Sequence, residues 1–439
     1  MGHEYLFKKS NLQGQRYWRC RHYFKIKCPS TVVTQGNNVV VQPGEHSHVG
    51  DTIQTQANAL VAKVKEAASS HVATRTILGE QLRDLENDVL ARLPKRSCME
   101  RTMRREKKKT NAVTPNPRNI NFEIPAEYED IIMYDSGQDD NERILAIGNH
   151  DVLRYAQSTL WFGDGTFEIV PTLFFQLYTV HCKVGNSYPP FIYFLLTNKT
   201  EGTYTRMIQI LKELVPDFMP ERILLDFEMA AINAFKNEFP TSVVSCCFFH
   251  LSQSVIRRVT ELGLKVRYET DGNFQMLVKS LSSLAFVPND DLYEVFEQLA
   301  ATFPDEPVCN DLLTYFESTY IRGPRIRRQY RNPRFLPGLW NHYEDAIACA
   351  PKTTNCVEGF HNSIKSMFLC AHPTVWTLLN GLRRDIAVHR LTVQNAEVQN
   401  LEKPRNKYVN LANRLAAKVA GYRNEEDKLR YLRAVAHMQ

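Results

Sequence analysis

Hydrophobic and polar positions follow two different periods along the middle of the chain. Apolar runs predict five strands, which are Thr159–Val170, Phe174–Lys183, Phe191–Thr197, Arg222–Asp226 and Ser242–Phe249. Apolar residues that recur every three or four positions predict helices over Thr203–Val215 and Met229–Phe239, and a third helix beginning near Ser252. The pattern therefore predicts three strands, then helix, strand, helix, strand and helix.

The flanks have other patterns, and 439 residues exceed what one core usually organises, so we expect two or three domains. Residues 1–50 are rich in aromatic and β-branched residues, which predicts a small β-rich domain. The pattern over residues 51–126 predicts helices and a proline-containing linker, and this region also contains a basic run. The element order over 127–370 is that of a ribonuclease-H-like α/β core with a helical insertion at about 260–350, and 371–439 predict a helical C-terminal region.

Composition excludes several classes of protein. A hydrophobic fraction of 43% with 23% charged residues is typical of a globular chain. The longest apolar run, Phe191–Leu196, is far shorter than the roughly 18 residues of a membrane-spanning helix, and no apolar signal-peptide core follows Met1. Ten cysteines are too few for a disulfide scaffold. We expect a soluble intracellular protein with reduced or metal-bound cysteines and no membrane partner.

Charge is distributed unevenly along the chain. Residues 1–110 contain 20 Lys and Arg against 10 Asp and Glu, a net charge of +10, whereas residues 111–375 carry −10 and residues 376–439 carry +6. Basic flanks indicate an anionic partner, and an acidic middle suits a site built from carboxylates. Most of the acidic surplus is expected on the solvated surface.

Two cysteines and two histidines near the N-terminus have the spacing of a metal site. Cys20 and Cys28 precede His46 and His48 in the pattern C-x7-C-x17-H-x-H. Thiolate sulfur and imidazole nitrogen are ligands of tetrahedral Zn²⁺. Because so small a β-rich unit has little core, structural zinc would supply part of its folding energy. The alternative is a pair of free thiols with surface histidines.

Three carboxylates suit a second kind of metal site. Asp164 lies inside the first predicted strand of the core, Asp226 ends a buried strand, and Glu358 lies at the predicted start of a late helix. Clustered carboxylates need cations, and oxygen ligands favour Mg²⁺ or Mn²⁺. Two such ions can assist phosphodiester chemistry. Spacing alone leaves open ordinary capping or turn roles for each acid.

A series of ordered segments carries a family resemblance. The segments are Tyr134–Gly137 with Arg143–Ile147, Trp161–Phe167, Phe175–His181, Leu225–Glu228, Cys247–His250 and Thr354–Asn362. Together they resemble the transposase domain of Mutator-like elements, the MULE transposase domain, over roughly residues 130–370. The resemblance implies a ribonuclease-H-like fold with an all-helical insertion, and metal-dependent hydrolysis and transesterification at transposon ends.

The same resemblance assigns roles to individual residues. It implies that Asp164 and Asp226 are the catalytic aspartates and that Glu358 is the catalytic glutamate. Cys247 and His250 form a C-x-x-H pair that we expect at the end of the last core strand. The resemblance implies that this pair supports the active-site loop or contacts DNA, and plain packing at the strand end is the alternative.

The N-terminal segment resembles a second family. Tyr17–Cys20 together with His46–His48 resembles the FLYWCH zinc finger, a module that frequently precedes MULE transposase domains. The resemblance implies that Cys20, Cys28, His46 and His48 are the zinc ligands. That family usually has another strand before the position of Tyr5, so we expect an incomplete sheet edge, as in a chain truncated at its N-terminus.

Basic residues gather in three places that suit contacts with DNA phosphates. They are Arg16 and Arg19 in the front module, the run Lys95–Lys109 with Arg104 and Arg105, and the segment Arg322–Arg334 with Arg325, Arg327 and Arg328. The run Lys95–Lys109 also fits a nuclear localisation signal, or simply a solvated helix end. Tyr330 and Trp340 are candidates for stacking on bases, although Trp340 fits a core position equally.

The C-terminal region leaves its role open. Trp376, Leu379, Leu382 and Ile386 share one face of a predicted helix, and the arginines lie outside this face. Contact with DNA, formation of a homodimer and a cap on the core all fit this pattern.

The leading hypothesis is a nuclear DNA transposase whose zinc module and basic segments bind double-stranded DNA. A domesticated DNA-binding regulator without catalysis is the main alternative, and a ribonuclease-H-like nuclease that cleaves without strand joining is a third. Terminal inverted repeats flanking the gene would favour the mobile element, and a single-copy locus without them would favour the regulator.

Overall fold

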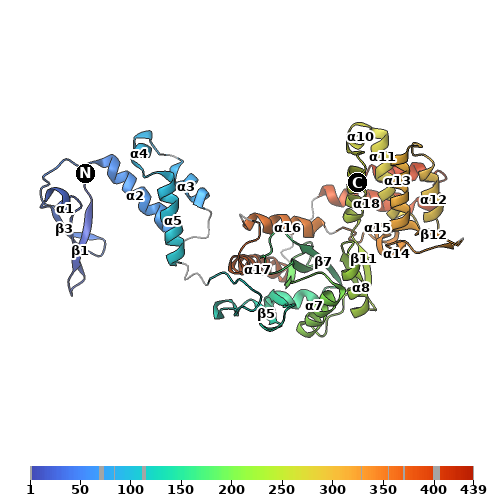
Figure 1. Ribbon diagram of the computed structural model, residues 1–439, viewed down its shortest axis with the longest axis horizontal. Coiled ribbons are helices and arrows are strands. Elements are labelled where there is room, and N and C mark those ends of the chain that lie inside the picture. The colour runs from blue at the N-terminus through green and yellow to red at the C-terminus, as the bar shows by residue number, and fades with distance from the viewer. Residues whose placement is uncertain are drawn as a thin grey trace. The chain divides into compact units, whose positions relative to one another are not determined.

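The computed structural model describes residues 2–68, 74–83, 85–110, 115–327, 329–353, 355–368, 371–398 and 406–438. The chain divides into two compact units, Met1–Pro115 and Asn116–Gln439. Figure 1 shows a β-rich part followed by helices in the first unit, and a sheet followed by a helical part in the second. No helix among these residues is long and apolar enough to cross a membrane.

The first unit begins with a four-stranded antiparallel sheet in chain order. Its strands are β1 (Tyr5–Ser10), β2 (Gln15–Cys20), β3 (Thr31–Gln35) and β4 (Asn38–Val41), with the one-turn helix α1 (Tyr23–Ile26) after β2. Among the described residues of this sheet and its loops, the buried cysteine and aliphatic side chains are those of Cys20, Cys28 and Val32. A core this small leaves most of the sheet exposed to solvent.

Four helices complete the first unit, namely α2 (Thr52–Ala67), α3 (Thr74–Leu82), α4 (Asn87–Arg92) and α5 (Arg96–Thr110). Asp51 caps α2, because its carboxylate accepts a hydrogen bond from the backbone N–H of Gln54. Leu60 and Val64 of α2 pack with Met99 and Met103 of α5. The helices predicted within residues 51–126 are thus present, and the basic run lies in the helix α5.

The second unit is built on a seven-stranded sheet of order β11-β10-β7-β8-β9-β6-β5. The strands are β5 (Ile132–Asp135), β6 (Leu145–Gly148), β7 (Leu160–Thr166), β8 (Gln176–Cys182), β9 (Pro190–Leu196), β10 (Arg222–Leu225) and β11 (Val243–Cys246). β10 runs parallel to β7 and β11 runs parallel to β10, whereas the other neighbours are antiparallel. The five predicted core strands are all present.

Helices cover both faces of this sheet. On one face, Tyr204 of α7 (Glu201–Leu214) and Phe235 of α8 (Met229–Glu238) pack against Tyr178 of β8. On the other face, Val357 of α16 (Asn355–Met367) packs with Leu160, Phe162 and Leu224. The sheet is therefore a buried middle layer, which explains why its strands are apolar on both sides.

The helix α9 (Phe248–Glu261) begins earlier than the sequence predicted. Strand β11 ends at Cys246, and Cys247 is the first residue outside α9. The expected strand to Phe249 is wrong, because the apolar stripe Leu251, Val255 and Val259 buries one face of a helix, and Phe248 packs in its first turn against Phe286. Consequently His250 lies on a helix.

The insertion and the C-terminal region supply the remaining elements. They are η1 (Ala126–Tyr128), α6 (His150–Leu153), η2 (Arg154–Gln157), α10 (Lys265–Thr270), α11 (Gly272–Ser283), η3 (Leu284–Phe286), α12 (Leu292–Ala300), α13 (Pro307–Phe316), η4 (Glu317–Ile321), β12 (Arg325–Ile326), β13 (Gln329–Tyr330), α14 (Pro337–Trp340), α15 (Tyr343–Ile347), α17 (Val375–Glu397), α18 (Asn406–Ala420), η5 (Tyr422–Asn424) and α19 (Lys428–Ala436). The expectation of an all-helical insertion is wrong at β12 and β13. Pro324 and Pro333 interrupt helical hydrogen bonding on either side of this pair.

The C-terminal helices cover the second unit at two places. In α17, Trp376 stacks on Tyr128, and the apolar face with Leu379 and Leu382 is fully buried. In α19, the hydroxyl of Tyr431 donates a hydrogen bond of 2.6 Å to the carbonyl of Phe286 in the insertion. The sequence left open DNA contact, a homodimer and a cap on the core for this region, and these contacts show the cap on the core.

A buried arginine fastens residues 116–124 to the sheet. Arg143 is fully buried, and its guanidinium donates to both carboxylate oxygens of Asp135 and to the carbonyls of Ile120 and Phe122, at 2.5–2.8 Å. The ring of Phe122 lies 4.6 Å from the guanidinium carbon. All of these partners satisfy a charge that would otherwise be costly to bury.

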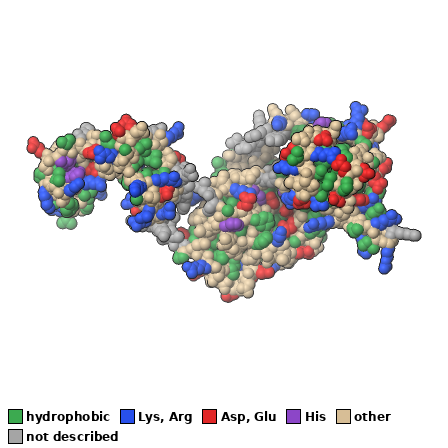
Figure 2. All heavy atoms as spheres, turned by 45° about the horizontal axis from the view of Figure 1, so that its top comes forward, with side chains coloured by type: hydrophobic (Ala, Val, Ile, Leu, Met, Phe, Trp, Pro, Cys, Tyr) green, Lys and Arg blue, Asp and Glu red, His purple; other side chains and the backbone are tan. Residues whose placement is uncertain are grey.

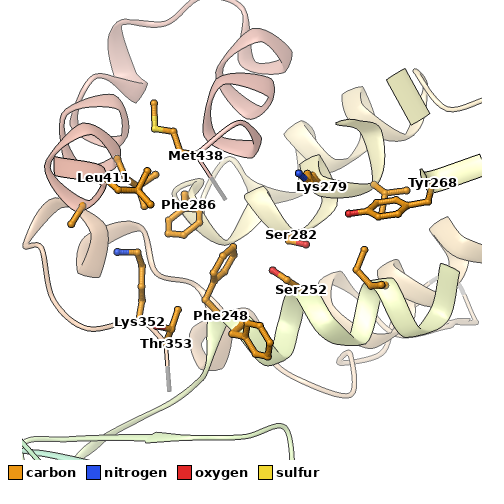
Figure 3. A pocket seen from close by; sticks show the side chains of 15 residues that line it. Phe248, Ser252, Tyr268, Lys279, Ser282, Phe286, Lys352, Thr353, Leu411 and Met438 are labelled. Carbon is orange, nitrogen blue, oxygen red and sulfur yellow. The ribbon is translucent and has the colours of Figure 1, made fainter. Parts of the chain in front are cut away.

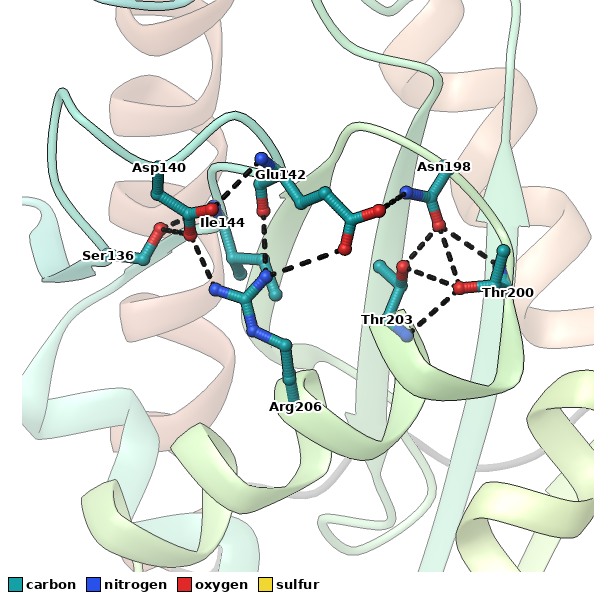
Figure 4. Close-up of polar contacts among 8 residues, drawn as sticks. All are labelled: Ser136, Asp140, Glu142, Ile144, Asn198, Thr200, Thr203 and Arg206. Atoms are coloured by element: carbon teal, nitrogen blue, oxygen red, sulfur yellow. Dashed lines mark hydrogen bonds and ion pairs between the residues drawn. The ribbon is translucent and has the colours of Figure 1, made fainter.

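A more exposed network joins the β5–β6 loop to α7 (Figure 4). Arg206 of α7 pairs with Asp140 at 2.5 Å, and Ser136 donates to the same carboxylate. Burial raises the pKa of Asp140, but the hydrogen bonds from Ser136 and Arg206 more than offset it and leave the pKa lowered. Thr200 caps α7 by accepting from the N–H of Thr203.

These two arginines should differ in their effect on stability. Arg143→Met should lower the free energy of unfolding by about 3–5 kcal/mol, because it leaves buried acceptors unpaired. Arg206→Ala, the matched surface variant, should cost less than about 1 kcal/mol. Urea unfolding of the full chain, followed by tryptophan fluorescence, measures both. Equal costs for the two variants would contradict this account of the Arg143 site.

Candidate metal centre and acidic site

Cys20, Cys28, His46 and His48 come together in the first unit. Their ligand atoms all lie within 4.8 Å of one another. Cys20 Sγ lies 3.2 Å from His48 Nε2, and Cys28 Sγ lies 3.4 Å from His46 Nδ1. Cys20 ends β2, and the other three ligands follow in loops, so the sheet brings distant residues to one point.

Hydrogen bonds orient both imidazoles toward this point. Ser30 donates to the carbonyl of Gly44, so its oxygen accepts from Tyr5, and Tyr5 accepts from His46 Nε2 at 2.7 Å. His48 Nδ1 donates to the carbonyl of Val49 at 3.0 Å. In each ring the other nitrogen therefore presents its lone pair to the cysteines. Such outer partners fix the tautomer of metal-binding histidines.

The cysteines have the chemistry that zinc requires. Burial raises the pKa of Cys28, but hydrogen bonds from the backbone of Ser30 and Ser47 more than offset it and bring the pKa to about 7. Burial raises the pKa of Cys20, so Zn²⁺ would bind this cysteine with release of its proton. Two cysteine sulfurs and two oriented imidazoles then supply the N₂S₂ donor set that zinc takes. The residues present fit a structural Zn²⁺.

Arg16 and Arg19 differ in their surroundings in the same module. Arg16 on β2 is exposed. Arg19 is half-buried, and its guanidinium lies 4.2 Å from the ring centre of Phe24 and 5.1 Å from that of Tyr23. Arg16 is thus open to a ligand, whereas Arg19 also supports the packing of α1.

In the second unit, strand register brings Asp164 and Asp226 together. β7 and β10 pair in parallel with Leu160 beside Arg222 and Phe162 beside Leu224. Continuing this register by two residues places Asp226, directly after β10, beside Asp164. Side chains in register on neighbouring strands point to the same face, so the two carboxylates are neighbours.

A chain of hydrogen bonds leads to Asp164 from across the sheet. His181 Nδ1 donates to the carbonyl of Tyr188 at 3.0 Å, and its Nε2 accepts from the hydroxyl of Thr179 at 2.9 Å. That hydroxyl lies 3.3 Å from His361 Nε2, and His361 Nδ1 lies 3.3 Å from the carboxylate of Asp164. Burial lowers the pKa of His181 to about 3, so this histidine is neutral.

Asp164 is ionised in spite of its burial. Burial raises its pKa, but the hydrogen bond and charge of His361 and a hydrogen bond of 2.8 Å from the N–H of Gly165 hold the pKa below its ordinary value. His361 thus contacts Thr179 through Nε2 and Asp164 through Nδ1. The first acid of the site therefore has a fixed orientation.

Asp226 titrates in the opposite direction. Burial and the nearby charges of Asp164 and Glu228 raise its pKa to about 8. Its Oδ1 is buried and has no hydrogen-bond partner among the described residues. Glu228 accepts a hydrogen bond from Tyr204, although burial still raises its pKa. An unsatisfied carboxylate oxygen beside a second carboxylate is the arrangement that a divalent cation satisfies.

A close approach behind the acids depends on glycine. A Cβ at Gly163 would lie 2.6 Å from the hydroxyl of Tyr178 and 2.8 Å from Leu225. The Tyr178 hydroxyl is buried without a hydrogen-bond partner among the described residues. Burial raises the pKa of Tyr178, and the negative charges of Asp226 and Asp164 raise it further. Any larger residue at position 163 would push this ring away.

Glu358 lies on α16, and its side chain is outside the described part of the chain. The helix itself is positioned by its neighbours, because Val357 packs on Phe162 and Leu224 and His361 contacts Asp164. The structure therefore brings the helix of the third acid to the face that carries the first. The oxygens of Asp164 and Asp226 fit Mg²⁺ or Mn²⁺ as ligands.

Cys247, which directly precedes α9, and His250, in the first turn of α9, lie close to this site. The N–H of Cys247 donates to the carbonyl of Leu225 at 2.8 Å, which ties α9 to the end of β10. Burial lowers the pKa of His250, and the charge of Asp164 opposes this effect. The pair thus stands beside the acids without forming a four-ligand metal site of its own among the described residues.

The other basic candidates lie on exposed elements. Arg104 and Arg105 are exposed on α5, where Arg104 pairs weakly with Glu100 at 3.7 Å. Arg325 and Arg327 are exposed on the β12–β13 pair. Arg328 lies outside the described residues. Trp340 is fully buried, so the core position that the sequence allowed for it is confirmed.

A cavity of about 460 Å³ opens beside the first turn of α9 (Figure 3). It is lined by Phe248, Phe249, Ser252, Ile256, Tyr268, Val278, Lys279, Ser282, Phe286, Lys352, Thr353, Leu411, Ala412, Leu415 and Met438. The lining is mostly apolar, and burial lowers the pKa of Lys352. Asp164 and Asp226 do not line it, so the cavity is separate from the acid pair.

Comparison with known protein families gives two matches. Residues 160–254 match the MULE transposase domain. The matched segment runs from β7 into α9 and includes Asp164, Asp226, Cys247 and His250, but it ends before Glu358. Residues 1–48 match the FLYWCH zinc finger domain, including all four proposed zinc ligands. Among curated proteins, no significant match was found.

The MULE transposase domain preceded by a FLYWCH zinc finger confirms the architecture that the sequence motifs indicated. It supports an origin of the chain in the transposase family. The FLYWCH match and the four-ligand cluster together support structural zinc in the first unit.

Sequence reasoning missed the residues that hold the acids in place. Thr179 faces Asp164 across the antiparallel β7–β8 register, and His181 faces Phe162 in the same way. Because Thr179 and His181 are two residues apart on β8, their side chains lie on the same face of the sheet. This spacing could have linked them to Asp164 once the pairing of β7 with β8 was known. His361 follows Glu358 by one helical turn and was visible in the late motif, but nothing in the sequence linked it to Asp164.

Removing a zinc ligand should release the metal and unfold the sheet of the first unit. Cys28→Ser should lose bound zinc, because a hydroxyl is a poor substitute for a thiolate, and folding energy depends on the metal in so small a module. Cys98→Ser alters an exposed cysteine of the same unit and is the matched control. Zinc analysis and limited proteolysis measure the outcome. Retention of zinc by Cys28→Ser would contradict the assignment.

Asp226 should make the Mg²⁺-free protein less stable as pH rises. The folded pKa of about 8 exceeds the ordinary value of 3.8, so Asp226 contributes stability that is fully present below 3.8 and is lost as pH rises through 8. Asp226→Asn cannot ionise, and its advantage in free energy of unfolding should grow between about pH 5 and about pH 9.

The measurement is urea unfolding followed by tryptophan fluorescence, since Trp161, Trp340 and Trp376 lie in the second unit. Asp217→Asn, at an exposed acid of that unit, should follow the wild type and serves as the control. A difference between Asp226→Asn and wild type that does not change with pH would show that Asp226 is not buried beside Asp164.

Proposed function

We propose that this chain is a DNA transposase that cuts and joins transposon ends by divalent-metal-dependent hydrolysis and transesterification. The observation that carries the proposal is the adjacency of Asp164 and Asp226 inside a segment that matches the MULE transposase domain. The strand order β11-β10-β7-β8-β9, with three antiparallel strands and two parallel ones, supports a ribonuclease-H-like core.

In this proposal Asp164, Asp226 and Glu358 hold Mg²⁺ or Mn²⁺. Bound metal supplies activation of the attacking oxygen and stabilisation of the leaving oxygen. The chain itself contributes orientation, because His361 fixes Asp164 and is held in turn by Thr179. Asp164 is buried, and the low polarity around a buried carboxylate strengthens its charge interaction with His361.

The remaining parts serve to hold double-stranded DNA. The zinc-stabilised FLYWCH module presents Arg16 and Arg19, and α5 presents Arg104 and Arg105 to the phosphate backbone. The run Lys95–Lys109 also serves as the nuclear localisation signal. Arg325, Arg327 and Arg328 contribute from the insertion, and Cys247 and His250 support the acid site from the start of α9.

Neutralising any of the three acids should abolish DNA cleavage. The variants are Asp164→Asn, Asp226→Asn and Glu358→Gln, and the substrate is a plasmid carrying the DNA that flanks the gene. Wild type should cleave it in Mg²⁺ and join the ends to a target, whereas each variant should lose at least about 100-fold in rate, because metal ions supply most of the charge stabilisation. Asp217→Asn is the control and should cleave like wild type.

The same assay separates the alternatives. Cleavage by all three variants at the wild-type rate would show that the active site lies elsewhere. Wild-type protein that binds the DNA without cutting it would indicate the domesticated regulator. Cleavage without joining would indicate a nuclease, and the acid site would then stand while transposition would not.

A further inference from the structure

A short β-hairpin projects from the helical insertion. β12 and β13 pair antiparallel, with Arg325 opposite Tyr330 and Ile326 opposite Gln329. Arg327 in the turn has a φ of 48°, the left-handed conformation that tight hairpin turns use. Ile326 and Arg327 therefore lie at the tip. Figure 1 shows the β12 hairpin at the outer end of the helical part.

The base of the hairpin is tightly fixed. The N–H of Gly323 donates to the carbonyl of Arg331 at 2.8 Å, and the N–H of Arg331 donates to the carbonyl of Pro324 at 3.1 Å. A Cβ at Gly323 would lie 2.4 Å from the carbonyl oxygen of Asn332, so the segments that lead into and out of the hairpin approach too closely for any other residue. This base gives the exposed tip a defined direction.

Arg322 attaches the hairpin to the helices. Its guanidinium lies between the rings of Tyr293 and Tyr330, 3.9 Å from each centre. It also pairs with Glu297 at 3.0 Å and with Glu317. Arg322 is therefore engaged in stacking and ion pairing within the protein. It is the one arginine of the segment, among those described, that has carboxylate partners.

The tip combines free positive charge with an exposed apolar side chain. Arg325, Arg327, Arg331 and Arg334 are exposed, and the structure describes no ion pair for any of them. Ile326, between the first two, is 46% exposed. Blue Lys and Arg side chains gather on this projection in Figure 2. A polyanion would satisfy the charge, and an apolar contact would cover the isoleucine.

We propose that this hairpin enters the minor groove of duplex DNA, with Arg325 and Arg327 on the flanking phosphates and Ile326 wedged between base pairs. The inference rests on the proposed function, which makes DNA the substrate. Two-stranded ribbons bind DNA in the major or the minor groove, and an apolar wedge inserted from the minor groove beside basic side chains unstacks a base step and bends the duplex. An acidic protein surface would match the charges but offers no stacked layer for the wedge to open.

The test measures two quantities on the full-length protein bound to duplex DNA from the flanks of the gene, labelled with 2-aminopurine along its length. Arg325→Ala and Arg327→Ala should each reduce the slope of log K against log salt by about 0.9, one phosphate contact each. Arg325→Lys should restore the slope. Ile326→Ala should keep the wild-type slope but lose the rise in 2-aminopurine fluorescence that reports unstacking.

Matched controls are Arg423→Ala and Val266→Ala, which alter an exposed arginine and an exposed valine elsewhere in the second unit. Both should behave like wild type. Unfolding midpoints of all variants should equal that of wild type, because every altered side chain is exposed.

The outcomes separate this proposal from the proposed function. Wild-type slopes for Arg325→Ala and Arg327→Ala, in a protein that binds and cleaves DNA, would overturn the hairpin contact alone. Reduced slopes with unchanged fluorescence for Ile326→Ala would overturn the wedge and place the hairpin on phosphates only. No binding of duplex DNA by wild type would overturn both proposals, and binding of the hairpin to an acidic protein instead would identify a different partner.

Discussion

The repulsion between two neighbouring carboxylates is the constraint around which the second unit is arranged. Asp164 and Asp226 are held together by a parallel strand pair whose register is fixed by buried apolar side chains. Two ionised carboxylates in a poorly solvated place are unfavourable, so one of them binds a proton more tightly. The sheet has to be stable enough to hold this arrangement, and its buried central strands β10, β7, β8 and β9 provide that stability.

Asp164 and Asp226 differ in the partners that surround their carboxylates. His361 reaches Asp164 from a helix nearly 200 residues away in sequence and is supported by Thr179 and His181. Asp226 receives no such partner for its inner oxygen among the described residues. Asp164 is therefore ionised and held in one orientation, whereas Oδ1 of Asp226 lacks a hydrogen-bond partner among the described residues. This asymmetry supports the proposed cation site, and it is the reason that we expect the acid pair to lower the stability of the metal-free protein.

The strands and most helices of the second unit could be predicted, because apolar runs in a buried sheet and three- to four-residue repeats are local signals. Boundaries were less secure. The run Ser242–Phe249 has the pattern of one apolar strand, yet Phe248 and Phe249 begin a helix, because a short apolar run fits either element and the buried stripe that follows has helical spacing. The β12–β13 hairpin was missed, since a two-residue strand pair has no periodicity and depends on the packing of Arg322 between two tyrosines.

The sequence by itself determined which chemical groups the protein has. The spacing of Cys20, Cys28, His46 and His48 indicated zinc, and the motifs around Asp164 and Asp226 indicated an acid site, because ligand type and local order are written in the chain. Only the tertiary structure decided which of these groups are neighbours in space. Strand register, the orientation of each imidazole and the contact of His361 with Asp164 arise from packing between residues far apart in sequence, and no local pattern encodes them.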